Sequence, residues 1–255
     1  MQSSTTRFML SGLLCAVFIN LPFYSYALEK DWLWATHFIF IWITNTLSAF
    51  LTFFHEIGHT IAGWFYGVPT IPMFDFKHGG GWAWQVSGQN YVLLFCVWAG
   101  LGYLWLLARE YPWLQKIIIG IFLFNIATAF NNFHLATMSF LGPAFEGLIG
   151  GFFLIRAFFD LAPRGASERF MNAFLGFAFP LNSLINGYSL LTVPSARERY
   201  FNQKDGQGAG DFDQIADKLE FISFDAGVIA WMVLTALCLI LPFVFYKLAG
   251  DYSED

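Results

Sequence analysis

The stretch AFLTFFHEIGHTIAGWFYGVP, residues 49–69, places a polar cluster inside a long apolar segment. The cluster is the pattern His-Glu-x-x-His, formed by His55, Glu56 and His59. Between residues 32 and 66 there is no lysine, arginine or aspartate, and Glu56 is the one glutamate. About 20 apolar residues suffice for a helix to cross the hydrocarbon core of a bilayer. The segment therefore predicts a membrane helix that carries ionisable side chains.

These three side chains have the spacing of a metal site. Residues four apart lie on one face of a helix, so the imidazoles of His55 and His59 can reach one ion. Glu56 lies beside that face and can accept a proton from a metal-bound water. Zinc suits imidazole ligands and lowers the pKa of its bound water to about 7. We predict a Zn²⁺ site; the alternative is a pair of core histidines with an incidental glutamate.

The composition of the chain indicates an integral membrane protein. Of its 255 residues, 57% are hydrophobic and 12% are charged, whereas soluble domains carry about 25% charged residues. This apolar content excludes a disordered chain, and the net charge of −5 argues against nucleic acid as a partner. We expect a multi-pass protein of the inner or plasma membrane, in contact with the lipid bilayer.

Long runs with few charges predict an all-α polytopic fold of six or seven transmembrane helices in a single domain, residues 1–255. Residues 1–28 could instead be a signal peptide, but the apolar run continues too far, which favours a retained helix. Basic residues divide evenly between the two sides, so the orientation stays open. The expected spans are residues 8–28, 32–66, 91–108, 117–141, 144–161, 170–193 and 226–248.

Two connections differ from the apolar runs. Residues 67–90 contain prolines, three successive glycines and an alternating apolar pattern, which predicts a short β-hairpin or re-entrant loop. Residues 194–220 are mostly polar and predict a loop. At 27 residues, that loop is too short for an appended soluble domain.

The region from Ala49 to Pro69 resembles the site-2-protease-like family of intramembrane zinc metalloproteases. That family places His-Glu-x-x-His in a membrane helix, continues through small residues into a turn like Gly67–Val68–Pro69, and commonly adds a hairpin. The resemblance implies peptide-bond hydrolysis in a transmembrane or juxtamembrane segment of another membrane protein. It also implies that an aspartate in a Leu-Asp-Gly motif completes the zinc site.

No Leu-Asp-Gly occurs in this sequence, so the third ligand must lie in another context. Aligning Ile215 with the apolar residue that follows the family aspartate places Asp211 in the ligand register. Asp211 could equally begin a helix after its glycine-rich loop. Four other residues are open as alternatives to Asp211, namely Asp213, Asp225, Glu146 and His134.

The sequence thus predicts a zinc metalloendopeptidase with His55, His59 and Asp211 as metal ligands and Glu56 as the catalytic base. Two other functions stay open. One is a membrane zinc hydrolase that acts on lipid amides. The other is a non-catalytic scaffold or transport protein that retains the metal site.

Overall fold

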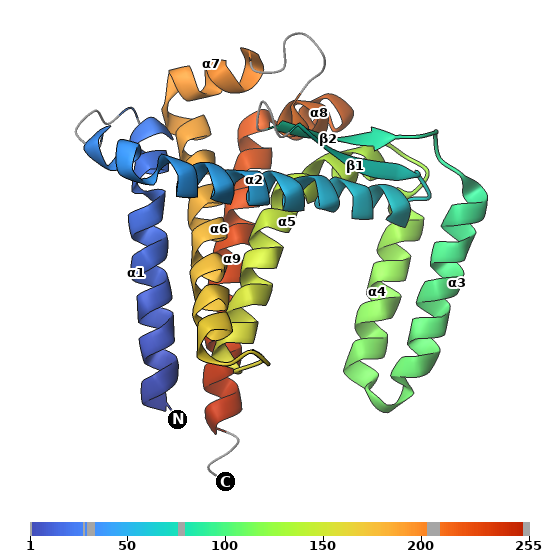
Figure 1. Cartoon of the computed structure of the whole chain (residues 1–255). Helices are drawn as coiled ribbons and strands as arrows, with labels where there is room; N and C mark the ends of the chain where they lie inside the picture. Colours follow the sequence, from blue (N-terminus) through green and yellow to red (C-terminus); the bar gives the residue numbers. More distant parts are fainter. Residues whose placement is uncertain (1, 28, 30–33, 76–79, 203–209, 252–255) are drawn as a thin grey trace.

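The computed structural model describes residues 2–27, 29, 34–75, 80–202 and 210–251, and most of this chain is helical (Figure 1). In chain order the elements are α1 (Gln2–Ala27), α2 (Trp34–Phe65), β1 (Thr70–Asp75), β2 (Gly80–Gln85), α3 (Tyr91–Leu107), α4 (Pro112–Thr128), α5 (Phe133–Phe158), α6 (Ala166–Thr192), α7 (Pro194–Asn202), α8 (Asp211–Lys218) and α9 (Phe224–Asp251).

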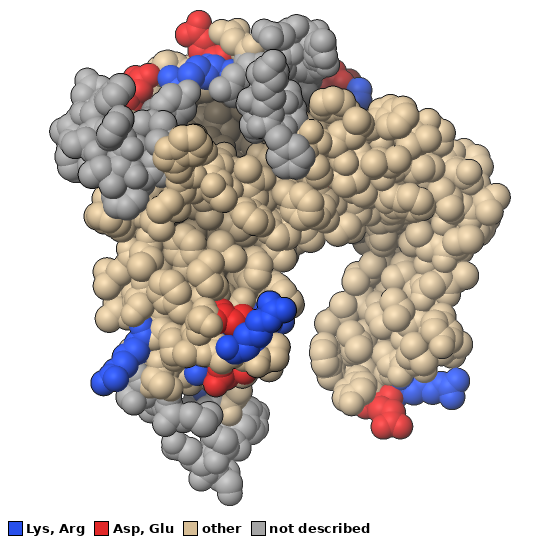
Figure 2. All heavy atoms as spheres, viewed as in Figure 1, with Lys and Arg blue, Asp and Glu red and all other residues tan. Residues whose placement is uncertain are grey.

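Four long helices, α1, α5, α6 and α9, pack together and form what we call the bundle (Figure 1). Among the described residues, four helical segments are long and apolar enough to cross a membrane: Ser4–Ser25, Tyr91–Glu110, Phe133–Phe158 and Phe224–Ala249. On the face seen in Figure 2, charged side chains lie at the ends of the molecule and leave an uncharged zone between them. The fold is therefore mostly helical and compatible with a membrane protein, while the number of spans stays a prediction.

Glycines allow the bundle helices to approach closely. A Cβ added to Gly147 would lie 3.0 Å from Oγ1 of Thr235 on α9, and one added to Gly151 would lie 3.0 Å from the Cys238 carbonyl oxygen. Small residues at helix contacts are typical of membrane bundles, where close backbone approach supplies the packing energy. A polar contact adds to this packing, because Asn182 on α6 donates to Oδ1 of Asn20 on α1 at 3.2 Å.

Helix α2 covers most of the expected span 32–66, but its direction differs from that of the bundle helices. In Figure 1 it runs across the bundle helices, near the ends where the hairpin and α8 lie. It packs against α1, α5, β1 and β2. Its second half carries the His-Glu-x-x-His cluster, and a buried charged group is costly unless it finds partners. Lying across the bundle gives this polar face partners on α5 and on α8.

The hairpin prediction for residues 67–90 is confirmed. Strands β1 and β2 pair in antiparallel fashion, with Thr70 opposite Gln85 and Asp75 opposite Gly80. The connecting residues 76–79 lie outside the described residues. Trp64 fixes the hairpin on α2, because its Nε1 donates to the Thr70 carbonyl oxygen at 2.8 Å.

The boundary between the expected spans 117–141 and 144–161 is wrong. The break falls between α4 and α5, at residues 129–132, and not at Pro143, which lies inside α5. Asn131 explains the break, because its side chain accepts the Phe133 backbone N–H at 3.0 Å and so helps to start α5.

The polar segment 194–220 is not simply a loop. It contains the helices α7 and α8, and residues 203–209 between them lie outside the described part of the chain.

Helices α3 and α4 form an arm that stands apart from the bundle, with a wide hollow between the two (Figures 1 and 2). The arm is fixed to the C-terminal end of α2. Asn125 on α4 donates to the Phe65 carbonyl oxygen at 2.8 Å and accepts from Nε1 of Trp98 at 2.7 Å. Tyr66 and Thr128 share a hydroxyl hydrogen bond of 2.8 Å. The arm is therefore joined to α2 by these polar contacts and by a buried apolar cluster that includes Leu94 of α3 and Tyr66.

Candidate metal centre

The centre lies where α2 crosses α5, and two glycines make this crossing possible. A Cβ added to Gly58 on α2 would overlap the Leu141 carbonyl oxygen on α5. A Cβ added to Gly142 on α5 would overlap Nε2 of His59. Since only glycine leaves this space, the backbone of α5 can pass directly beside the histidines of α2.

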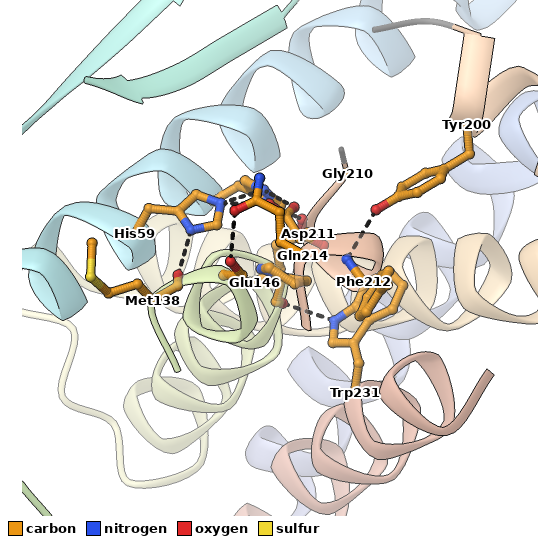
Figure 3. A network of polar contacts seen from close by, with 12 residues as sticks. His59, Met138, Glu146, Tyr200, Gly210, Asp211, Phe212, Gln214 and Trp231 are labelled. Atoms are coloured by element: carbon orange, nitrogen blue, oxygen red, sulfur yellow. Dashed lines mark hydrogen bonds and ion pairs between the residues drawn. The ribbon is translucent and has the colours of Figure 1, made fainter. Parts of the chain in front are cut away.

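Three side chains converge at the crossing, and they come from α2 and α8 (Figure 3). Nε2 of His55 lies 3.1 Å from Nε2 of His59 and 3.0 Å from Oδ2 of Asp211. Nε2 of His59 lies 3.3 Å from Oδ1 of Asp211. All three side chains are 13–20% exposed. The group can hold a metal ion, and it contains the three residues that the sequence suggests as ligands.

Both imidazoles are oriented through their second ring nitrogen. Nδ1 of His55 donates to Oε1 of Glu146 at 2.8 Å, and Nδ1 of His59 donates to the Met138 carbonyl oxygen at 2.6 Å. Ser183 in turn donates to Oε2 of Glu146 at 2.6 Å. When Nδ1 carries the proton, Nε2 has a free lone pair directed to the centre. Such outer contacts are usual around metal-binding histidines, and they argue against two incidental core histidines.

Helix α8 positions the aspartate. Gly210 precedes it, and a side chain there would clash with the Tyr200 ring, since an added Cβ would lie 2.6 Å from Cε1. Phe212 is buried and packs against Trp231, with the two ring centroids 5.4 Å apart. Trp231 itself donates to the Pro143 carbonyl oxygen at 2.8 Å. Burying an aromatic side chain of this size contributes about 1.5–3 kcal/mol, so Phe212 anchors the residue next to Asp211.

The electrostatics favour an anionic Asp211. Burial opposes its ionisation, but the imidazoles of His59 and His55, when protonated, stabilise the carboxylate and hold the pKa of Asp211 well below its usual range. Burial, together with the negative charge of Asp211, raises the pKa of Tyr200. Tyr200 therefore stays neutral, and its hydroxyl oxygen accepts the Phe212 backbone N–H at 3.2 Å. Asp211 is in the protonation state that binds a cation.

Glu56 lies in the same cleft as these three groups. The cleft has a volume of about 250 Å³ and is lined by α2, both strands of the hairpin, α5 and α8. Glu56 is 5% exposed and lies under β2, where a Cβ added to Gly81 would be 2.7 Å from its Cγ. The cleft can therefore bring a small reactant to the metal group and a carboxylate together.

The other candidates for the third ligand take different positions. Glu146 contacts His55, but on Nδ1 rather than on the side where the three groups meet. Asp213 accepts the Gly210 backbone N–H at 3.0 Å and so helps to start α8. Asp225 pairs with Arg197 at 2.9 Å, outside the cleft. His134 contacts the Asn131 carbonyl oxygen at the start of α5.

The sequence reasoning missed several contributors. Gly142 and the Met138 carbonyl oxygen have no local sequence signal, because both act on His59 through a contact across about 80 residues. Gln214 also lines the cleft and accepts from Ser139 at 3.0 Å. Its position three residues after Asp211 is a usable signal, since such residues share a helix face.

Comparison with models of protein families, with curated proteins and with solved structures finds no match to this chain.

Proposed function

We propose that the protein is a membrane zinc metalloprotease that hydrolyses a peptide bond with a metal-activated water. One observation carries the proposal: His55, His59 and Asp211 converge in a cleft that also holds Glu56. Three protein ligands plus an open position are the usual arrangement of a catalytic zinc site. The resemblance of residues 49–69 to site-2-protease-like enzymes supports the same reaction.

The donor set fits zinc. Two nitrogens and one carboxylate oxygen are ligands that zinc accepts at about 2.0–2.1 Å, so tetrahedral ligands lie about 3.3 Å apart. The two Nε2 atoms lie 3.1 Å apart, and each lies close to a different oxygen of Asp211, at 3.0 Å for His55 and Oδ2 and at 3.3 Å for His59 and Oδ1. With one ligand atom from each residue, the three atoms lie within 4.8 Å of one another. Zinc bound there would supply a Lewis acid for the substrate carbonyl and would acidify a water.

The chain's own residues would then act on the water and on the leaving group. Glu56 takes a proton from the water while the water oxygen bonds to the carbonyl carbon. Glu56 then passes that proton to the amide nitrogen as the C–N bond breaks. Glu146 and the Met138 carbonyl oxygen keep both imidazoles in the tautomer that leaves Nε2 available. Asp211 contributes negative charge that favours a divalent cation.

The substrate we propose is an extended segment within or next to the membrane span of another protein. A helical peptide bond is protected by its own hydrogen bonds, so the segment must unwind to react. Gly81, Trp82 and Ala83 of β2 line the cleft, and β2 is a strand of a sheet with two strands. An extended peptide can pair with such an edge, which holds its backbone beside the metal group.

Metal analysis of the purified protein tests the proposal. We expect close to one zinc per chain, retained in Glu56→Gln with loss of peptide hydrolysis. The variant Asp211→Ala removes a proposed ligand, so its zinc affinity should fall by more than the roughly 10–100-fold that loss of an outer hydrogen-bond partner costs. The variant Asp225→Ala is the control and should keep its zinc.

Three results would contradict the proposal. Hydrolysis of lipid amides but not of peptides would favour a lipid amidase. A Glu56→Gln variant with unchanged cellular function would favour a scaffold or transport protein. Full metal content in Asp211→Ala would show that the coordinating group is wrong.

A further inference from the structure

Helix α8 begins without a capping side chain. The first backbone N–H groups of a helix have no acceptor within it, and the residue before the helix usually supplies one from its side chain. Gly210 holds this N-cap position, with φ −65° and ψ 171°, but it has no side chain. Asp213 accepts the N–H of Gly210 at 3.0 Å, a contact that does not reach the N–H groups of the helix itself. Gly210 is buried, so their acceptor must come from another part of the chain.

Tyr200 on α7 provides this acceptor (Figure 3). Its hydroxyl oxygen accepts the backbone N–H of Phe212, the second residue of α8, at 3.2 Å. The backbone N–H of Asp211, the first residue, also bonds to Tyr200. An N-cap side chain normally accepts from the second or third residue of its own helix. The phenol therefore takes the place of an N-cap side chain, although it belongs to a different helix.

The position of the phenol is fixed by packing on two sides. Its ring centroid lies 5.5 Å from that of Phe224 and 6.3 Å from that of Phe212, and both phenylalanines belong to a buried apolar cluster. On the other side, a Cβ added to Gly210 would overlap the hydroxyl and the ring of Tyr200. Gly210 and Tyr200 are thus complementary, because the residue without a side chain leaves room for the group that replaces one.

We propose that Tyr200 is a positioning residue of the metal centre, which caps α8 and so holds the carboxylate of Asp211 beside the two histidines. This inference rests on the metal-binding part of the proposed function. The histidines come from α2, which has 32 residues, whereas Asp211 comes from α8, which has eight. Helices shorter than about 12–15 residues have little stability of their own. The placement of Asp211 therefore depends on contacts from outside α8, and the cap from Tyr200 acts directly at its backbone.

The variant Tyr200→Phe tests this role, because it removes the hydroxyl and keeps the ring. We expect the Kd for Zn²⁺, measured on the purified full chain in detergent with a competing chelator, to rise about tenfold, as for loss of a helix cap or of an outer partner. With Co²⁺ bound at saturation instead of zinc, the visible absorption should also change, because it reports the geometry of the ligands.

Tyr246→Phe is the matched control. Tyr246 on α9 also donates its hydroxyl to another helix, to Oγ1 of Thr5 at 3.5 Å, and it lies outside the cleft. Both the Kd for Zn²⁺ and the Co²⁺ spectrum should stay unchanged in this variant.

A double-mutant cycle uses the complementarity of Gly210 and Tyr200. Gly210→Ser alone places a side chain against the phenol and should weaken zinc binding, and Tyr200→Ala alone should weaken it by removing the cap. In the Tyr200→Ala background, Gly210→Ser should instead strengthen zinc binding, because the added hydroxyl has room and can cap α8 from the usual position. The effect of one substitution thus changes sign with the residue at position 200.

The outcomes are distinct. An unchanged Kd for Zn²⁺ in Tyr200→Phe would overturn the inference. A weaker Kd with the Co²⁺ spectrum of the wild type would also overturn it, because Tyr200 would then only stabilise the fold. The same holds if Gly210→Ser weakens zinc binding in both backgrounds. If the wild type binds neither Zn²⁺ nor Co²⁺, the proposed function itself fails.

Discussion

The metal centre is packed more tightly than the arm, and the space around the glycines of the two regions shows this difference. At the centre, an added Cβ would overlap another helix at Gly58 and a histidine at Gly142. In the arm, a Cβ at Gly100, Gly102 or Gly120 would meet no atom within 4 Å. Close packing thus determines the position of the candidate metal ligands, whereas the arm consists of helices with much exposed apolar surface.

The largest expected effect comes from Gly142→Ala. The added methyl group overlaps Nε2 of His59 and must push the ring away from His55 and Asp211. We expect zinc affinity to fall beyond the roughly 10–100-fold range of outer-contact changes, because a ligand itself moves. Zinc titration with a competing chelator measures the change. Unchanged affinity with an intact fold by circular dichroism would mean that α5 does not pass so close to α2.

A smaller loss is expected from Glu146→Gln, which removes the negative charge that faces Nδ1 of His55. Changes of this kind typically cost about 10–100-fold in metal affinity, and we expect the lower end because the amide can still accept one hydrogen bond. Glu168→Gln is the matched control, since Glu168 pairs with Arg156 and lies outside the cleft. Equal zinc affinities of the two variants would contradict the role of Glu146.

Local patterns in the sequence were sufficient to predict three features: the half of α2 that carries His55 and His59, the hairpin, and Asp211 as a candidate ligand. They depend on spacing, turn residues and helix starts, which act over a few residues. Hydropathy could not give the direction of α2, because it reports length and polarity but not what surrounds the helix. It also misplaced the end of α4, since Pro143 is tolerated inside α5. The contact between Ser139 and Gln214 spans 75 residues and needs the tertiary structure.

The attachment of the arm can be broken without touching the metal group. Asn125→Leu removes the partner of both the Phe65 carbonyl oxygen and the Trp98 indole. Each buried group left unpaired costs about 1–3 kcal/mol. We expect faster hydrogen exchange in α3 and α4, measured by mass spectrometry, with zinc affinity unchanged. A parallel loss of zinc would show that the arm helps to hold α2 in place.

The smallest effect is expected from Gly120→Ala in the arm. The added methyl group meets open space, and alanine restricts the unfolded chain, so the variant should gain about 0.4–1 kcal/mol. Thermal unfolding in detergent, with Gly142→Ala in parallel, measures the contrast between the two glycines. A destabilised Gly120→Ala protein would mean that the arm packs against a partner at this position.

If the protein cleaves peptides as proposed, the placement of α2 across the bundle would also affect the fate of the cleaved products. The metal group lies toward the N-terminal end of α5, so with the bundle helices spanning a bilayer it would be nearer to one face than to the midplane. Hydrolysis creates a new carboxylate and a new ammonium group, and either charge would be costly to leave in hydrocarbon. At this depth both fresh chain ends emerge next to bulk water, so the two fragments can separate without dragging a charge through lipid.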